Sequence, residues 1–296
     1  MDTLSAWQAA GELVKLNGQN IFVRQGGLKH GQVLVLIHGY PSASWDWQPI
    51  WNKLGQHFRL ITLDMLGFGF SDKPIGVDYL IREQASLFTS LLKKLDVTDY
   101  HILAHDYGDT VAQELLARQL EPIADPKILS CCLLNGGLFP ESHRPVLLQK
   151  LLLSPLGRVV TLFTTKSALK RNFHKIFGKN TPPSEEVIDG LWQLLMHNNG
   201  RRIMPKLIHY IVQRKQNRER WVGALTNAQV PLKYICGMTD PISGAHMAAR
   251  FDELIADADV CELNDIGHYP QLEAPKQVLD AFFDFHHGQA PHEKPA

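Results

Sequence analysis

Short apolar runs alternate with longer amphipathic runs in the first part of the chain. Residues 32–39, 58–65 and 100–106 are apolar almost throughout, a pattern typical of strands that are buried on both faces of a sheet. Residues 79–95 and 108–120 instead repeat apolar positions at helical spacing. Strand and helix in turn predict an α/β fold, with a mostly parallel sheet and helices on both faces.

The sheet is expected to start with an antiparallel pair and to gain strands late in the chain. Residues 12–26 alternate apolar and polar side chains around Asn17 and Gly18, which predicts a hairpin with a two-residue loop. Later apolar stretches, which we expect to be strands, are residues 127–137, 230–238 and 257–263. Together these elements predict an eight-stranded sheet, closed by a helix at residues 275–287.

A long helical segment interrupts the series of strands. About ninety residues with helical periodicity and no strand signal separate Gly137 from Val230, which is too long for a loop. We therefore predict a helical cap at residues 138–227, inserted into a core domain made of residues 1–137 and 228–296. The last nine residues of the chain are expected to form a solvated tail.

Charge is divided unevenly between these parts. The chain has 30 Lys and Arg and 30 Asp and Glu. Residues 138–225 contain 15 Lys and Arg but only 5 Asp and Glu, so the rest of the chain contains 15 Lys and Arg and 25 Asp and Glu. One interpretation is an ordinary solvated helix surface together with attraction between cap and core. The other is that the cationic cap steers anionic or membrane-surface substrates into the cleft. The balanced total gives no indication of a nucleic-acid partner.

Composition favours a cytoplasmic protein. Hydrophobic residues make up 45% of the chain, yet no apolar run approaches the roughly 20 residues that cross a bilayer. The first 16 residues lack the basic start and the continuous apolar middle of a secretory signal. We expect no stable membrane insertion, and the oligomeric state is left open.

A carboxylate stands at the turn after residues 100–106. Asp106 is the centre of "AHDYG", with the small residues Ala104 and Gly108 two positions to either side, as a tight strand-to-helix turn requires. Such a turn lifts the central side chain above the sheet edge, where we expect Asp106 to be exposed and ionised. The alternative is an aspartate that caps the following helix.

Two later residues follow predicted strands in the same way. Asp240 lies in "ICGMTDP" and His268 in "NDIGHYP", and a parallel sheet brings such loops to the edge where Asp106 stands. The order along the chain is nucleophile, acid, histidine, as in other enzymes with a nucleophile elbow. A lone histidine among 14 is more often a surface or packed residue, but the two carboxyl groups favour a functional role for His268.

A further loop supplies hydrogen-bond donors at this edge. In "LIHGYPSASWDW" (residues 36–47), Gly39 allows the backbone to turn, so that the N–H of Tyr40 faces the same cavity as the N–H of Tyr107. Two such donors would form an oxyanion hole, a contribution of about 3 kcal/mol per donor in known enzymes.

These motifs, together with "DMLGFGFSDKP" at residues 64–74, resemble the α/β-hydrolase superfamily over nearly the whole chain. The resemblance is to the branch of epoxide hydrolases and haloalkane dehalogenases, which use an aspartate nucleophile. "HDYGDTVAQELL", "LLNGGLFPESHRPVLLQKLL", "YIVQRKQNRERWVGAL" and "HYPQLEAP" are similar to the mesoderm-specific transcript proteins, a hydrolase-like group. The resemblance implies Asp106 as nucleophile, Asp240 as orienting acid and His268 as base.

An aspartate nucleophile suits displacement at saturated carbon. Attack on an ester would give a high-energy anhydride, whereas attack on an sp³ carbon leaves an alkyl ester on Asp106. His268, oriented by Asp240, would then activate a water molecule that attacks this ester. The N–H groups of Tyr40 and Tyr107 would stabilise the resulting oxyanion.

The leaving group separates the two chemistries of this branch. Dehalogenases resemble one another in placing tryptophan directly after the aspartate, where this chain has Tyr107. Epoxide hydrolases typically supply two cap tyrosines as acids, and of seven tyrosines here only Tyr210 lies in the predicted cap. Its phenol, with an ordinary pKa near 10, is able to protonate an alkoxide, alone or with His209 or Tyr107 assisting. The alternative is that Tyr210 is only a packed residue of an amphipathic helix.

The leading interpretation is an epoxide hydrolase that acts on a small apolar or partly polar organic substrate, with water as co-substrate. It needs no metal or organic cofactor. Dehalogenation, or hydrolysis of another activated bond, is the alternative among enzymes. A binding or regulatory protein that kept the fold and lost turnover is the alternative of another class.

Overall fold

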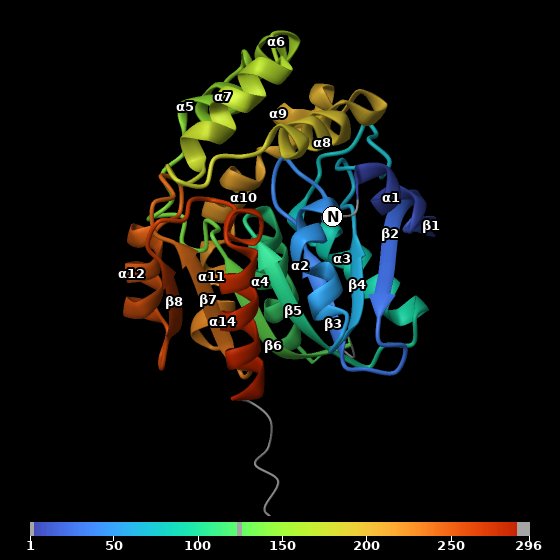
Figure 1. The fold of residues 1–296 in the computed structure, drawn as a ribbon, viewed down its shortest axis with the longest axis vertical. Coiled ribbons are helices and arrows are strands. Elements are labelled where there is room, and N and C mark those ends of the chain that lie inside the picture. Colours follow the sequence, from blue (N-terminus) through green and yellow to red (C-terminus); the bar gives the residue numbers. More distant parts are fainter. Residues whose placement is uncertain (1–2, 123–125, 289–296) are drawn as a thin grey trace, which may run out of the picture.

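A twisted sheet of eight strands runs through the centre of the molecule, with helices on both faces (Figure 1). The computed structural model describes residues 3–122 and 126–288. The strand order is β1-β2-β4-β3-β5-β6-β7-β8. β1 and β2, and β2 and β4, are antiparallel, and all other neighbours are parallel. The predicted α/β fold with a mostly parallel sheet is confirmed. Of the predicted tail, residues 288–296, all but Gly288 lie outside the described residues.

The sheet and the helices around it have the following bounds. The strands are β1 (Glu12–Leu16), β2 (Gln19–Gly27), β3 (Val33–Ile37), β4 (Arg59–Leu63), β5 (Asp99–His105), β6 (Lys127–Leu134), β7 (Leu232–Gly237) and β8 (Asp259–Leu263). The helices outside residues 138–227 are α1 (Leu4–Ala9), η1 (Ser44–Trp47), α2 (Gln48–Leu54), α3 (Ile81–Lys94), α4 (Tyr107–Gln119), α12 (Ala245–Leu254), α13 (Pro270–Glu273) and α14 (Pro275–His287).

Burial on both faces explains the apolar runs. Along β3, Leu34 and Leu36 pack on one side of the sheet with Trp51 of α2. Val35 and Ile37, which alternate with them, pack on the other side. Because successive side chains of a strand point to opposite faces, a strand covered by helices on both sides favours apolar residues at every position, and buried polar ones such as Thr62 and His101 need hydrogen-bond partners.

The antiparallel start of the sheet is the hairpin that the sequence predicts. Leu16 of β1 pairs with Gln19 of β2, so the loop consists of Asn17 and Gly18 alone. Both loop residues have positive φ, 48° and 85°, as a type I′ turn requires. Asparagine and glycine adopt this conformation most readily.

The carboxyl edge of the sheet opens between β3 and β5. β3 pairs with β4 on one side and with β5 on the other, so the chain leaves the ends of β3 and β5 in opposite directions. Ligands of open α/β sheets bind in the crevice that such a reversal leaves. The loops that begin at His38 and Asp106 therefore flank the crevice.

Residues 138–227, which we call the insert, contain helices and no strand. They form α5 (Leu147–Leu153), α6 (Gly157–Leu162), α7 (Lys166–Ile176), α8 (Glu185–Met196), η2 (His197–Ile203), α9 (Met204–Leu207), α10 (Tyr210–Gln216) and α11 (Arg218–Thr226). In Figure 1, α5 to α9 lie over the carboxyl ends of the strands, at the top, whereas α11 lies beside the sheet and packs on α4. No helix of the described residues is long and apolar enough to cross a membrane.

A buried carboxylate ties the insert to the sheet. Glu114 of α4 accepts hydrogen bonds from Arg220 Nε at 2.7 Å and from Trp221 Nε1 at 2.7 Å, both on α11. Arg118 donates to the same carboxylate at 3.1 Å. Burial would raise the pKa of Glu114, but these donors outweigh it and lower the pKa. Attraction between cap and core, one of the two interpretations of the uneven charge, therefore has a structural basis.

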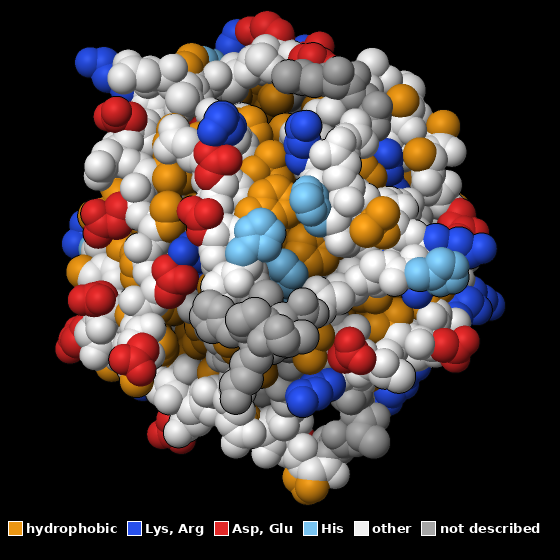
Figure 2. All heavy atoms as spheres, turned by 60° about the horizontal axis from the view of Figure 1, so that its bottom comes forward, with side chains coloured by type: hydrophobic (Ala, Val, Ile, Leu, Met, Phe, Trp, Pro, Cys, Tyr) orange, Lys and Arg blue, Asp and Glu red, His pale blue; other side chains and the backbone are white. Residues whose placement is uncertain are grey.

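The face away from the insert is seen in Figure 2, where Asp and Glu side chains are spread over the surface. This face belongs to the part of the chain that has an excess of ten acidic residues, because the region outside residues 138–225 carries 15 Lys and Arg and 25 Asp and Glu. Lys and Arg side chains also appear on this face, so the excess of acidic residues is a property of the core as a whole.

Replacing Glu114 should loosen the contact between α4 and α11. We expect Glu114→Ala to lower the free energy of unfolding by about 3 kcal/mol, because Arg220 and Trp221 lose a buried partner. The matched control is Glu121→Ala, which removes the half-exposed second partner of Arg220 and should cost under about 1 kcal/mol. Urea denaturation measures both. Because the pKa of Glu114 is lowered, its contribution to the free energy of unfolding is present at neutral pH and is lost in acid. Equal effects of the two variants would contradict this account.

Candidate active site

Asp106 occupies a strained turn between β5 and α4. Its φ of 50° and ψ of −104° lie outside the regions that non-glycine residues favour, at a cost of about 1–3 kcal/mol. Gly108 is needed because a Cβ there would lie 2.2 Å from the carbonyl oxygen of Ile37. The Asp106 side chain makes no capping hydrogen bond to α4. The capping alternative is therefore wrong.

The insert covers the Asp106 carboxyl group, which is 3% exposed. The prediction that this group is exposed is wrong, because the turn lifts it above the sheet edge but into contact with α10. Oδ2 accepts a hydrogen bond from Tyr40 N at 3.0 Å, and Oδ1 accepts one from the Tyr210 hydroxyl at 3.2 Å. The two oxygens thus have different surroundings: a backbone donor holds Oδ2, and the insert faces Oδ1.

Two cationic groups lie beside Oδ1. Arg214 NH2 is 3.8 Å away and His268 Nε2 is 4.0 Å away. Burial alone would raise the pKa of Asp106, but the charges of His268 and Arg214, aided by the Tyr40 N–H, lower the pKa below its usual value. The buried Asp106 carboxyl is accordingly ionised at neutral pH.

Asp240 orients His268. The Nδ1 atom of His268 donates to Asp240 Oδ2 at 2.7 Å. Burial would lower the pKa of His268, but the Asp240 carboxylate, with a smaller effect from Asp106, raises it to about 9. Asp240 also accepts from Ser243 Oγ at 2.7 Å and Ile242 N at 2.8 Å. Its pKa, which burial would raise, is lowered to about 2, chiefly by His268.

The loop that carries His268 is held by groups the sequence did not point to. Glu273 Oε2 accepts from Gly267 N at 2.9 Å, and Oε1 accepts from Tyr269 N at 2.9 Å. His105 Nε2 donates to the carbonyl of His268 at 2.7 Å. Burial lowers the pKa of His105 to about 4, so it is neutral at physiological pH and acts as a hydrogen-bond donor without competing with His268 for a proton.

Tyr210 is the first residue of α10 and is fully buried. Its ring lies between the rings of Tyr107 and Tyr40, with centroids 4.8 Å and 6.1 Å away. Burial raises the pKa of Tyr210 well above the ordinary value, and the negative charge of Asp106 is the second largest cause. The phenol is therefore protonated and donates to Asp106. By contrast His209, a suggested helper, is exposed on the surface of the insert, and that suggestion is wrong.

Arg214 is the site residue that sequence reasoning missed. Its guanidinium stacks on the Tyr210 ring, with Cζ 4.4 Å from the centroid. Nε donates to Thr110 Oγ1 at 2.6 Å, and NH2 donates to the carbonyl oxygen of Asp106 at 3.0 Å. The available signal was its spacing, because residues four apart share one face of a helix. An arginine four positions after Tyr210 had to point to the same side.

A narrow apolar cavity of about 90 Å³ reaches this cluster. Tyr40 and His268 of the core line it, together with side chains of the insert. Most of the insert's lining residues are apolar, namely Val146, Leu148, Leu152, Leu169, Phe173, Ile176 and Met204, and the polar ones are Gln149, Asn172 and Lys175. Its lining is suited to an apolar molecule.

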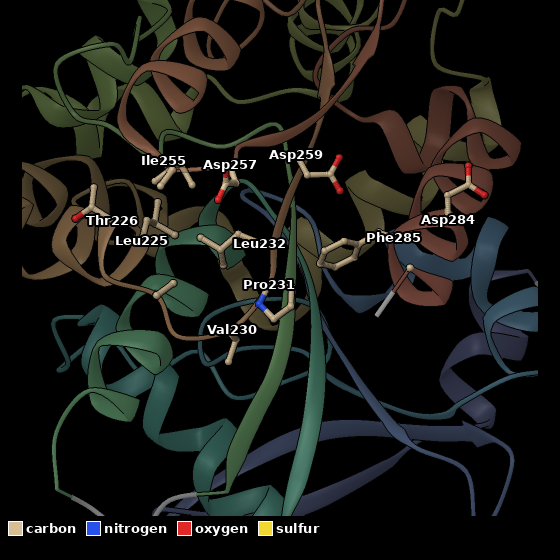
Figure 3. A pocket seen from close by; sticks show the side chains of 13 residues that line it. Leu225, Thr226, Val230, Pro231, Leu232, Ile255, Asp257, Asp259, Asp284 and Phe285 are labelled. Atoms are coloured by element: carbon tan, nitrogen blue, oxygen red, sulfur yellow. The ribbon is translucent and has the colours of Figure 1, made fainter. Parts of the chain in front are cut away.

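A wider cavity of about 420 Å³ lies elsewhere. Figure 3 shows its lining, with Leu232 at the start of β7, Asp259 at the start of β8, and Asp284 and Phe285 of α14. These elements meet at the amino edge of the parallel strands, opposite Asp106. Its described lining has the carboxyl groups of Asp257, Asp259 and Asp284 but no histidine, so we do not assign the site to it. The described residues contain no group of three or more His, Cys, Asp and Glu that could hold a metal ion.

Comparison with known proteins agrees with this architecture. The model of the alpha/beta hydrolase fold family matches residues 32–275. The mouse mesoderm-specific transcript protein is 42% identical over 296 residues, covering 95% of this chain and 87% of the relative. Among solved structures, the epoxide hydrolase CorEH superposes with a TM-score of 0.77 at 19% identity, covering 94% of this chain and 98% of the other. The haloalkane dehalogenase DbeA from Bradyrhizobium elkanii superposes with a TM-score of 0.76 at 18% identity, covering 94% of this chain and 99% of the other. The chain belongs to the α/β-hydrolase fold family.

Proposed function

We propose that this protein is an epoxide hydrolase, which opens its substrate through a covalent ester on Asp106. The observation that carries the proposal is the hydrogen bond of 3.2 Å between the Tyr210 hydroxyl and Asp106 Oδ1. It puts a protonated phenol next to an ionised carboxylate, so that an acid and a nucleophile face the same point. An epoxide needs both, because its oxygen leaves as a strongly basic alkoxide.

In the first step, Asp106 Oδ1 attacks a ring carbon and the bond from that carbon to the ring oxygen breaks. Oδ1 is the attacking atom because Oδ2 is already held by the Tyr40 N–H. The ring oxygen takes the proton of Tyr210, and the guanidinium of Arg214 over the phenol ring stabilises the phenolate that forms. A halide would need no such acid, and Tyr107 stands where dehalogenases place a tryptophan donor.

Ester formation turns His268 into a base. The negative charge of Asp106 is one of the causes that raise the pKa of His268, and the ester removes that charge. His268 then passes its proton to the Tyr210 phenolate through water, which restores the phenol and leaves a neutral imidazole.

In the second step, His268 removes a proton from water, and the hydroxide attacks the carbonyl carbon of the ester. Oδ2 becomes the oxyanion, which the N–H of Tyr40 stabilises in place. The N–H of Tyr107, at the first position of α4, has no partner within the helix and serves as the second donor. Collapse of this tetrahedral intermediate breaks the bond between the carbonyl carbon of Asp106 and the ester oxygen Oδ1, and the carboxyl proton passes to the departing alkoxide, which leaves as the diol. Asp106 is again ionised and His268 again protonated.

Trapping the covalent ester is the direct test. In His268→Gln the second step loses its base, so we expect incubation with a panel of epoxides to give a stable adduct on Asp106, found by mass spectrometry of peptides. Asp106→Asn with the same panel is the control and should give none. Halide release from haloalkanes without turnover of epoxides would favour dehalogenation. No adduct with either panel would favour a binding or regulatory protein.

The role of Tyr210 has its own test. We expect Tyr210→Phe to lower the rate of epoxide opening about 10²-fold, since general acids contribute on that order. Tyr79→Phe removes another buried hydroxyl, one that is bonded to Pro74 O, and is the matched control for loss of a phenol. Single-turnover kinetics measures the step. If Tyr210→Phe opened epoxides as fast as Tyr79→Phe, Tyr210 would not be the acid.

The charge of Asp240 should set the protonation of His268. In the wild type we expect the imidazole to titrate with a pKa of about 9, so that it is charged below that pH and neutral above it. Asp240→Asn removes the largest cause that raises this pKa and should shift the titration to lower pH. Chemical shifts of ¹³C-labelled histidine follow it. The control is Asp259→Asn, which changes a surface carboxylate paired with Lys233. An unchanged titration in Asp240→Asn would contradict the proposal that Asp240 raises the pKa of His268.

A further inference from the structure

The outer face of α5 and α6 is apolar and has no partner in the structure. Eleven large hydrophobic side chains of the described residues are exposed, and six of them fall within residues 147–163. The six are Leu147, Leu151, Leu156, Val159, Leu162 and Phe163. Scattered exposed hydrophobic residues are normal, but a group of this kind marks an interaction site. We call residues 144–179, which include these helices, the arm.

The arm has two different apolar faces. On α5, Leu147 and Leu151 are exposed, whereas the adjacent Leu148 and Leu152 line the cavity that ends at Tyr40 and His268. Each pair is four residues apart and therefore shares one side of the helix. One face of α5 is thus the wall of the catalytic cavity, and another is open to solvent.

The arm is also strongly basic. Residues 142–184 contain eight Lys and Arg and no Asp or Glu. Lys166 and Lys170 form ion pairs with Asp189 and Glu185 of α8. The other six make no ion pair within the described part of the chain, and all six are exposed; they are Arg144, Lys150, Arg158, Arg171, Lys175 and Lys179.

Exposed leucine and phenylalanine among basic residues fit a lipid surface better than a protein partner. Amphipathic helices with this composition lie in the interface of membranes, where anionic headgroups attract the basic side chains. Protein interfaces instead are depleted in lysine at their cores. The position of the arm agrees, because α5, α6 and α7 stand furthest from the sheet in Figure 1. The region outside residues 138–225 has the excess of acidic residues, 25 Asp and Glu against 15 Lys and Arg, and an anionic surface repels such an excess.

We infer that the arm docks reversibly on anionic phospholipid bilayers and that the enzyme takes an apolar substrate from the bilayer into the cavity beside His268. Leu147, Leu151, Leu162 and Phe163 enter the headgroup region, and Lys150 and Arg158 contact the lipid phosphates. The second half of this inference rests on the proposed function, whereas lipid binding by the arm does not.

Flotation with vesicles tests the docking. The full-length protein is mixed with vesicles of phosphatidylcholine containing about 30% phosphatidylglycerol, a surface negative enough to attract basic segments, or with vesicles of phosphatidylcholine alone. We expect binding to the anionic vesicles that weakens with salt, and at least about tenfold weaker binding to the neutral ones. Equal binding to both, or none to either, would overturn the inference.

Variants locate the contact. Leu162→Ser with Phe163→Ser, and separately Lys150→Glu with Arg158→Glu, should each weaken binding to anionic vesicles at least about tenfold. The control, Leu13→Ser with Ile75→Ser, removes two hydrophobic residues that are equally exposed elsewhere and should leave binding unchanged. Should the control variant lose binding to the same extent, the arm would not be the contact.

Two readouts separate this inference from the proposed function. Vesicle binding is measured without substrate, so it stands or falls independently of any adduct on Asp106. Turnover is compared for a short water-soluble epoxide and for a long-chain epoxide dissolved in anionic vesicles, with a loss expected in the arm variants for the second only. A protein dimer that dissociates in Leu162→Ser with Phe163→Ser, without vesicle binding by the wild type, would identify the face as a contact between copies of the chain and refute lipid docking.

Discussion

A carboxylate that is both buried and ionised costs several kcal/mol unless charges and hydrogen bonds compensate for the lost water. Asp106 is such a group, and its compensation comes from distant parts of the chain. Tyr40 follows β3, His268 follows β8, and Tyr210 and Arg214 belong to the insert. Removing the insert would leave the carboxylate without two of these partners. The insert is therefore part of the electrostatics of the site as well as its cover.

The charges of the site form a balanced set. Asp106, Asp240 and His268 have pKa values shifted in the directions that keep them charged, and the guanidinium of Arg214 adds a second positive charge. Burial raises the pKa values of two other carboxyl groups nearby, those of Asp46 and Asp109, well above the usual range, which favours their uncharged forms. Neutralising Asp106 by an ester would leave an excess positive charge, which favours loss of the proton from His268. In the proposed mechanism, the same interactions that compensate for the buried charge of Asp106 would also prepare His268 to act as the base of the second step.

The insert has to serve two environments at once. Its inner side carries Tyr210 and Arg214 against the sheet, together with the apolar wall of the cavity. Its outer side combines exposed hydrophobic residues with unpaired basic ones. A helix as short as α5 can do both because side chains one position apart point about 100° away from each other. One short helix therefore lines the cavity with Leu148 and Leu152 and exposes Leu147 and Leu151 to solvent.

Much of the fold was predictable because it follows from local patterns. Continuous apolar runs such as Leu34 to Ile37 arise only where both faces of a strand are covered, and Asn17 with Gly18 specifies the hairpin loop. Parallel strands then force the loops after them to one edge, which is why Asp106, Asp240 and His268 could be placed together from their positions after strands. The aspartate at position 106, where a nucleophile elbow usually has serine, predicts displacement at saturated carbon in place of ester hydrolysis, and this stays a prediction.

The remaining features depend on how the insert packs on the sheet. Periodicity showed that residues 138–227 are helical, but it could not say which helix faces the crevice. It therefore gave neither the burial of Asp106, nor the role of Arg214, nor the width of the cavity. The pKa values of His268 and Asp106 are likewise sums over neighbours that are distant in sequence. Residue order along the chain specifies which chemical groups are present and at which sheet edge they emerge, whereas solvent exclusion and charge compensation arise only once separate segments are in contact.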